Sequence, residues 1–142
     1  MNDISYKILE HLYYMQLPSN PVVVFDIDNT LLHSNGTCIK PIVNIYNHIK
    51  TMGILPILIT NRLGITPTIE FTKYQLKNCG IYGYKSLYFR HPERDNNPYR
   101  FKEKARYNIH ERGMNVVMTI GDQQWDVGNY GGVGIIVPIF KK

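Results

Sequence analysis

Two acidic residues separated by a single position are the strongest chemical signal in this sequence. Asp26 and Asp28 directly follow the apolar residues 22–25. On an extended chain, residues two apart point the same way, so both carboxylates are expected at one place. Carboxylates this close repel each other unless one is protonated or a cation lies between them. The simpler alternative is that the two aspartates only cap a turn or a helix.

Polar residues also follow two other apolar runs. Thr60, Asn61 and Arg62 follow one, and Asp122 follows another, with Asp126 four residues further on. In open α/β sheets, functional groups gather at the carboxyl ends of the strands. We therefore expect Asp122 to bring a third acid close to the first two. With no His or Cys nearby in sequence, such a group suits Mg²⁺ rather than Zn²⁺.

A Mg²⁺ site that also offers a lysine and a threonine is suited to phosphate. The metal and Lys102 would neutralise phosphoryl oxygens, and the Thr60 hydroxyl or a backbone N–H would orient them. A carboxylate at the same place can attack phosphorus and form an aspartyl phosphate. Lys104 competes with Lys102 for the lysine's role, although a basic helix face is more often simply solvated.

The elements that must position these groups are buried strands alternating with helices. Five runs predict strands, the last of them weakly, at residues 22–25, 54–59, 115–120, 133–137 and 86–90. They are rich in β-branched residues without polar alternation, which is typical of a parallel sheet covered on both faces. Helical spacing of apolar residues occurs around residues 4–13, 42–49, 69–76 and 99–112. The sequence therefore predicts an α/β fold built from right-handed βαβ units.

Length and composition are consistent with one domain spanning residues 1–142. The chain has 16 Lys and Arg against 11 Asp and Glu, a net charge of +5 and 44% apolar residues. This excludes general disorder, and the +5 weakly indicates an anionic partner. Cys38 and Cys79 are the only cysteines, which favours free thiols in a reducing compartment. No run approaches the roughly 18 apolar residues of a membrane span, and the charged N-terminus does not resemble a signal peptide, so we expect a cytoplasmic protein with no membrane contact.

Four motifs in order resemble those of the haloacid dehalogenase (HAD) superfamily of phosphotransferases. They are FDIDNTLL, the Thr that ends ILPILIT, the Lys of YRFKEKAR, and GDQQWD. Thr60-Asn61-Arg62, Phe89-Arg90, Lys102 with Arg106, and Gly121-Asp122-Gln123 are similar to motifs of the acid-phosphatase branch (class B, plant vegetative-storage-protein-like, subfamily IIIB). The resemblance implies a Rossmann-like three-layer fold, with a mostly parallel sheet of about five strands and helices on both faces.

The resemblance also implies a role for each matching residue. Asp26 would be the nucleophile and a metal ligand. Asp28 would be the general acid and then the base, with its backbone carbonyl on the metal. Asp122 would ligate Mg²⁺. The phosphoryl group would be held by Thr60, Lys102 and the backbone N–H of Asn61, which replaces the usual glycine. Supporting positions would be Asp126, Thr30 and Arg62. For Arg90 and Arg106, structural ion pairing and substrate contact stay equally open.

The spacing of the motifs leaves no room for a cap domain. Thr30 and Thr60 are separated by 29 residues and Thr60 and Lys102 by 41, which a flap near residues 31–39 and ordinary helices and strands consume. An open site could admit a large substrate such as a nucleic-acid end or a phosphoprotein. It could equally be covered by a partner subunit in a homo-oligomer.

The predicted activity is Mg²⁺-dependent phosphomonoester hydrolysis through an aspartyl phosphate. The phosphorylated substrate is either a small metabolite or a nucleotide or nucleic-acid end. Residues 85–112 favour the latter because they hold eight Lys and Arg against four Asp and Glu. A phosphoacceptor domain resembling a receiver is one alternative, although a receiver needs no acid at the position of Asp28. A non-catalytic binding or storage protein on the same fold is the other.

Overall fold

The computed structural model describes residues 3–141. It contains four α-helices, a short 3-10 helix and five strands, in the order α1 (Asp3–Tyr14), β1 (Pro21–Phe25), α2 (Lys40–Thr51), β2 (Leu55–Leu63), α3 (Thr66–Asn78), β3 (Ser86–Arg90), α4 (Pro98–Glu111), β4 (Asn115–Gly121), η1 (Gln124–Asp126) and β5 (Val133–Ile136). All five strands are parallel, in the spatial order β3-β2-β1-β4-β5. The predicted α/β fold and all five predicted strands are confirmed.

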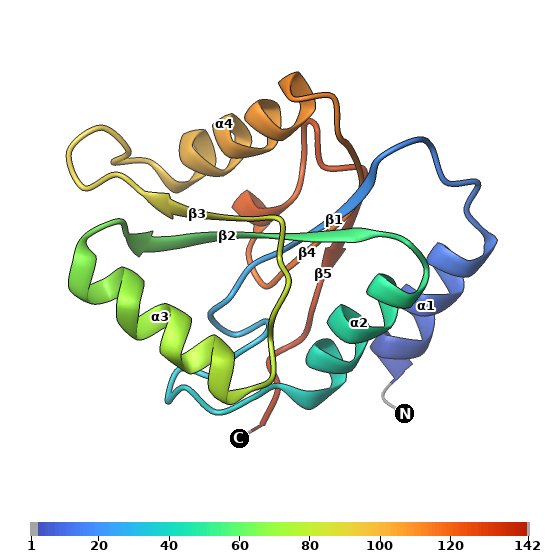
Figure 1. The fold of residues 1–142 in the computed structure, drawn as a ribbon, viewed down its shortest axis with the longest axis horizontal. Coiled ribbons are helices and arrows are strands. Elements are labelled where there is room, and N and C mark those ends of the chain that lie inside the picture. The colour runs from blue at the N-terminus through green and yellow to red at the C-terminus, as the bar shows by residue number, and fades with distance from the viewer. Residues whose placement is uncertain (1–2, 142) are drawn as a thin grey trace.

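Helices cover both faces of this sheet (Figure 1). Helices α1, α2 and α3 lie on one face and α4 lies on the other. Strand β1 shows why both faces are apolar: Val23 and Phe25 pack with the first group of helices, while Val22 and Val24 pack with α4. Alternate residues of a strand face opposite sides of a sheet. A strand between two helical layers must therefore be apolar at every position, as this one is.

The pairing of β2 with β3 is interrupted next to the predicted site residues. Thr60 pairs with Phe89, but the next pair is Leu63 with Arg90. Asn61 and Arg62 therefore bulge out of the ladder directly after the last buried residue of β2. Such bulges re-aim side chains at the edge of a sheet.

The segment after β1 folds as a small flap, and no cap domain is present in residues 3–141. Leu32 forms an antiparallel bridge with Cys38, and the His33 N–H donates to the Thr37 carbonyl at 2.8 Å. The Asn35 side chain closes the turn by accepting from the N–H and hydroxyl of Thr37. Every other connection between consecutive strands consists of one helix, α or 3-10, and short loops. The predicted absence of a large cap is confirmed.

Two expectations from the sequence are wrong. The helical spacing of residues 4–13 predicts Tyr13 on the apolar face of the first helix with Ile8 and Leu12, which are buried, but Tyr13 is 76% exposed. Cys38 and Cys79 were expected as free thiols, but they form a disulfide with a Cα–Cα distance of 5.7 Å. It joins the end of the flap to the end of α3, a contact between distant segments that residue counts do not reveal.

The disulfide bears on the expected compartment. Disulfides persist in oxidising surroundings and are rare in the cytosol, so the cysteines do not support a cytoplasmic location. Among the helices within residues 3–141, none is both long enough and apolar enough to cross a bilayer.

Candidate active site

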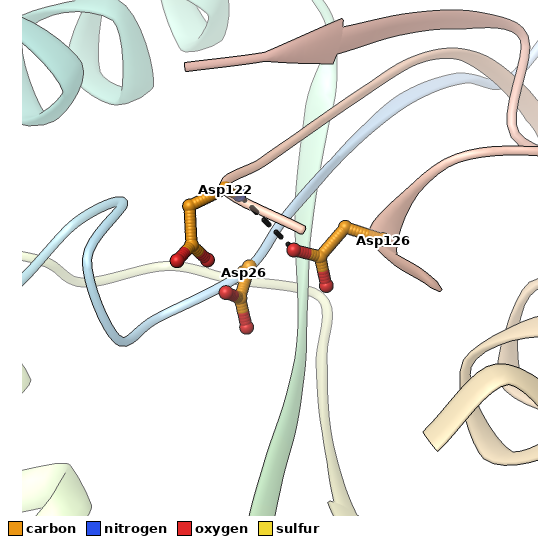
Figure 2. A group of neighbouring side chains, drawn as sticks. All are labelled: Asp26, Asp122 and Asp126. Atoms are coloured by element: carbon orange, nitrogen blue, oxygen red, sulfur yellow. Dashed lines mark hydrogen bonds between the residues drawn. The ribbon is translucent and has the colours of Figure 1, made fainter. Parts of the chain in front are cut away.

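Three carboxylates converge at the carboxyl ends of β1 and β4 (Figure 2). Asp26 directly follows β1, Asp122 directly follows β4, and Asp126 ends η1. One oxygen from each lies within 4.8 Å of the others. Because β1 and β4 are neighbouring parallel strands, their ends meet at one edge of the sheet, and the Asp26 N–H donates to the Ile120 carbonyl there. We call these three residues the acidic cluster.

Lys102 is buried directly against the acidic cluster. Its side chain is 1% exposed, and its Nζ lies 2.9 Å from Asp26 Oδ1 and 2.8 Å from Asp126 Oδ1. Nζ also donates to the Ile59 carbonyl at 2.6 Å. By contrast, Lys104 is 69% exposed and pairs with Asp95. Of the two lysines weighed from the sequence, Lys102 is therefore the one that reaches the acids.

Burial governs the protonation of these groups. The pKa of Asp26 is raised to about 6; burial is the largest cause, Lys102 opposes it, and the Asp122 carboxylate adds to it. Burial, together with Asp26, raises the pKa of Asp126 as well. Burial alone would lower the pKa of Lys102, but Asp26 and Asp126 raise it overall. The lysine therefore stays charged, but it does not fully offset the burial of Asp26 and Asp126, whose pKa values stay raised.

The backbone holds Asp126 in the cluster. Its Oδ2 accepts hydrogen bonds from the N–H groups of Asp122 at 3.1 Å and Gln123 at 3.0 Å. The Gln123 side chain accepts in return from the N–H of Asp126, which completes a capping box. Position 121 must be glycine, because a Cβ there would collide with the Asp126 side chain. The resemblance implies a supporting position for Asp126, and its carboxylate lies within the acidic cluster.

Asp28 lies outside the acidic cluster and has its own cation. The chain turns sharply after β1, with the Ile27 carbonyl accepting from three following N–H groups and Asn29 at a φ of 60°. The carboxylate of Asp28 is 42% exposed and pairs with Arg62 at 2.7 Å. The two neighbouring aspartates thus avoid repulsion because Lys102 serves one and Arg62 serves the other.

Helix α3 supports Arg62, a connection that sequence reasoning missed. Arg62 Nη1 donates to Thr72 Oγ1 at 2.9 Å and to Gln75 Oε1 at 2.7 Å. Thr72 is fully buried. The available signal was a pair of polar residues three apart on the sheet-facing side of a helix, where apolar residues are expected.

The remaining predicted residues line the same edge of the sheet. Thr60 is fully buried, and its Oγ1 accepts from the Arg62 N–H at 3.1 Å. Thr30 is also fully buried, and no partner for its Oγ1 is found within residues 3–141. The same holds for the Oδ1 of Asn61 in that part of the chain. Buried polar atoms normally have partners, so these two are exceptions to the rule.

The two arginines whose roles the sequence left open both bind backbone carbonyls. Arg90 Nε donates to the Asn61 carbonyl at 3.0 Å, which holds the bulge after Thr60. Arg106 is buried and donates to the carbonyls of Trp125, Asp126, Val127 and Asn129. The pKa of Arg106 is lowered, and burial is the largest cause. Arg106 thus fixes the loop that carries Asp126.

The donor set of the acidic cluster fits a divalent metal with oxygen ligands. All three side chains are carboxylates, and Asp122 is partly exposed to solvent. One buried lysine stands against these three acidic groups. Hard cations such as Mg²⁺ and Ca²⁺ take ligand sets of this kind.

Comparison with known proteins places the chain in a family. A model of the HAD superfamily, subfamily IIIB (Acid phosphatase), matches residues 35–133, more than half of the chain. The chain belongs to this family. The resemblance inferred from its motifs is confirmed. The match includes Thr60, Lys102 and Asp122 and begins after Asp28.

Solved structures share the fold of this chain. A chain of the Pnkp1/Rnl/Hen1 complex superimposes with a TM-score of 0.71 at 19% identity, over 87% of this chain and 48% of that one. A chain of the Pnkp1/Rnl/Hen1 RNA repair complex gives 0.74 at 18% identity, over 87% and 45%. This chain therefore spans about half the length of those chains.

A third structure matches along most of both chains. It is the core domain of a protein from Streptococcus pneumoniae TIGR4, provisionally assigned as a phosphoglycolate phosphatase, with a TM-score of 0.51 at 17% identity over 88% and 90%. No curated protein matches this chain in sequence.

Proposed function

We propose that this phosphatase hydrolyses phosphomonoesters with Mg²⁺ through an aspartyl phosphate on Asp26. The observation that carries the proposal is the buried Asp26 carboxylate, held by Lys102 at 2.9 Å beside two further acids at the end of β1. A nucleophile needs a fixed, desolvated oxygen next to groups that neutralise phosphoryl charge. Asp26 combines these properties.

The reaction proceeds in two displacements. In the first, a carboxylate oxygen of Asp26 attacks phosphorus, the bond from phosphorus to the ester oxygen breaks, and Asp28 gives its proton to the departing alcohol. In the second, Asp28 takes a proton from water, the water oxygen attacks phosphorus, and the bond to Asp26 breaks. Phosphate leaves, and Asp28 again carries the proton. Arg62 keeps the Asp28 carboxylate in one orientation through both displacements.

Other residues bind the phosphoryl group and the metal. Thr60, Lys102 and the Asn61 N–H bind the phosphoryl oxygens. Asp26, Asp122 and the backbone carbonyl of Asp28 would hold Mg²⁺, with Asp126 in support. When bound, the metal supplies positive charge that offsets the charge of the phosphoryl oxygens. Thr30 supports the turn that carries Asp28.

The test is phosphate release from p-nitrophenyl phosphate. We expect turnover with Mg²⁺, loss of turnover with chelator, and loss in Asp26→Asn. Glu70→Gln is the matched control, because Glu70 is exposed on α3. Persistent activity in Asp26→Asn would overturn the nucleophile assignment. A stable phosphorylated protein without turnover would instead indicate a phosphoacceptor domain. The absence of turnover on any substrate would indicate a non-catalytic protein.

We also propose that the substrate is a nucleotide or a nucleic-acid end. Three observations support this: the net charge of +4 on residues 85–112, the uncapped site, and the fold shared with a chain of an RNA repair complex. Hydrolysis of terminally phosphorylated oligonucleotides should exceed that of sugar phosphates, and it should weaken steeply as salt rises. Equal rates on oligonucleotides and sugar phosphates, with no salt dependence, would instead indicate a general phosphomonoesterase.

A further inference from the structure

Two adjoining hollows lie at the edge of the sheet formed by β3. The larger, about 500 Å³, is lined mainly by apolar and aromatic side chains, among them Ile69, Tyr88, Phe89, Phe101 and Tyr107. The smaller, about 180 Å³, is lined by Arg94, Asp95, Asn96, Asn97, Arg100 and Lys104. Arg94, Asp95 and Lys104 line both, so the hollows are neighbours. We call them the aromatic hollow and the basic hollow.

Helix α4 separates these hollows from the acidic cluster. Lys102 and Arg106 point to the side of the cluster and of η1. Phe101, Lys104 and Asn108 line the aromatic hollow instead. Positions three and four apart share a helix face, so the helix presents one face to each site. A helix with its side chains is about 10 Å across, which sets the scale of the separation.

The wall of the aromatic hollow is rigid. The Tyr88 hydroxyl donates to Asn108 Oδ1 at 2.7 Å, which fixes its ring against α4. Phe101 is 5% exposed and packs in the core of that layer. Rigid aromatic rings beside an open space are what nucleobases stack on, with little dependence on sequence.

The basic hollow has an excess of positive charge. Asp95 is its one acid and is already engaged, because it accepts from the His91 N–H at 2.9 Å and pairs with Lys104 at 3.2 Å. For Arg94 and Arg100, no carboxylate partner occurs within the part of the chain that is described. Guanidinium groups bind phosphate oxygens with paired N–H donors.

We propose that the two hollows form a subsite for one internal nucleotide of a single-stranded nucleic acid. The base stacks in the aromatic hollow and its phosphodiester lies in the basic hollow, while the phosphorylated end reaches Asp26 across α4. A base enters such a hollow only when it is unpaired, so the strand is single. The pairing of an aromatic with a cationic hollow favours a nucleic acid over a phosphopeptide. The assignment of the strand's end rests on the proposed function, but binding at the subsite does not.

The first test removes the charge of the basic hollow. In Arg94→Ala/Arg100→Ala, affinity for a single-stranded octanucleotide should fall about tenfold, and the slope of log affinity against log salt should become shallower by about 0.7, the value for one phosphate. Lys73→Ala/Lys77→Ala, an equal charge change on exposed positions of α3, should leave both unchanged. Hydrolysis of p-nitrophenyl phosphate should not change in either variant. Equal affinity in the two variants would overturn the subsite, as would a selective loss of phosphopeptide hydrolysis.

The second test locates the base. Octanucleotides with a terminal phosphate at either end and one abasic position are compared as substrates. KM should rise several-fold when the abasic site lies at one particular internal position. An equal KM for every position of the abasic site would overturn the stacking site. Binding of unphosphorylated octanucleotide by Asp26→Asn separates the two proposals. If it depends on Arg94 and Arg100 while the wild type hydrolyses nothing, the proposed function fails and the subsite stands. If the wild type hydrolyses its substrates but this binding does not depend on Arg94 and Arg100, the subsite fails and the proposed function stands.

Discussion

Arg62 forms a bidentate pair with the carboxylate of Asp28, with Nε 3.0 Å from Oδ2 and Nη2 2.7 Å from Oδ1. A forked guanidinium sets both the position and the plane of a carboxylate, which a lysine cannot do. The bulge after Thr60 aims Arg62 at this carboxylate, and Thr72 and Gln75 of α3 hold its other nitrogen. The orientation of Asp28 therefore depends on α3, a helix that carries none of the proposed catalytic residues.

Arg62→Lys should lower kcat by about 100-fold on alkyl phosphates, the lower end of what a positioned general acid contributes. The loss should be much smaller on p-nitrophenyl phosphate, because nitrophenolate leaves without needing a proton. The measurement is kcat against the basicity of the leaving group. Arg112→Lys, at an exposed position, is the control. An equal loss on all leaving groups would mean that Arg62 does not act through Asp28.

The pKa of Asp26, raised by burial from 3.8 to about 6, predicts a stability change with pH. Folding favours the protonated form, so the contribution is fully present below about pH 4 and is lost as the pH rises through about 6. This difference between the folded and unfolded pKa corresponds to about 3 kcal/mol of folding free energy. In chelator, Asp26→Asn should thus raise the free energy of unfolding by up to about 3 kcal/mol at pH 7 and change it little at pH 4.

Asp95 supplies a control of opposite sign for that experiment. Burial raises its pKa, but the His91 N–H and Lys104 outweigh burial and lower it overall. Its ionised form therefore stabilises the fold, and Asp95→Asn should be more destabilising at pH 7 than at pH 4. The measurement is urea denaturation at both values. The same trend in both variants would contradict the assigned cause.

Mg²⁺ should stabilise the protein by neutralising the acidic cluster. At about 100 times its Kd, a ligand that binds only the folded state adds about 2.7 kcal/mol to the free energy of unfolding. The partly exposed Asp122 can be changed to Asn without opening the core, and this variant should lose most of that gain. Glu70→Gln should keep it. Denaturation curves with and without Mg²⁺ measure the difference, and an equal gain in Asp122→Asn would exclude the cluster as the binding site.

Removing the disulfide should lower stability by about 4 kcal/mol, the chain-entropy value for a loop of this size. Cys38 and Cys79 are 41 residues apart. Dithiothreitol should shift the urea midpoint of the wild type to that of Cys38→Ser/Cys79→Ser and leave the double variant unaffected. If reductant changed neither midpoint, the thiols would not be joined in solution.

The sequence predicted the sheet because burial on both faces leaves a direct trace. Residues 22–25 are apolar throughout, and β1 is indeed packed between two layers of helices. The gathering of Asp26 and Asp122 followed from the same pattern, since adjacent parallel strands end at one edge. Both predictions used only the order of residues along a strand.

Contacts between side chains of distant elements were less predictable. The position of Asp126 in the cluster depends on backbone hydrogen bonds within a single 3-10 turn. The support of Arg62 by α3 depends on how far the helix lies from the bulge, which spacing does not specify. Cys38 and Cys79 meet because the flap folds back toward α3. Each of these depends on tertiary packing rather than on local pattern.

The disulfide also closes residues 38–79 into a covalent ring. The ring contains α2, β2 and α3, and with them Thr60, Asn61 and Arg62. Asp26, Lys102 and Asp122 lie on the two arms of chain outside it. A protease that cuts one peptide bond within the ring would therefore leave both arms joined through sulfur. The cut protein would keep its mass on a non-reducing gel and separate into two fragments only after reduction.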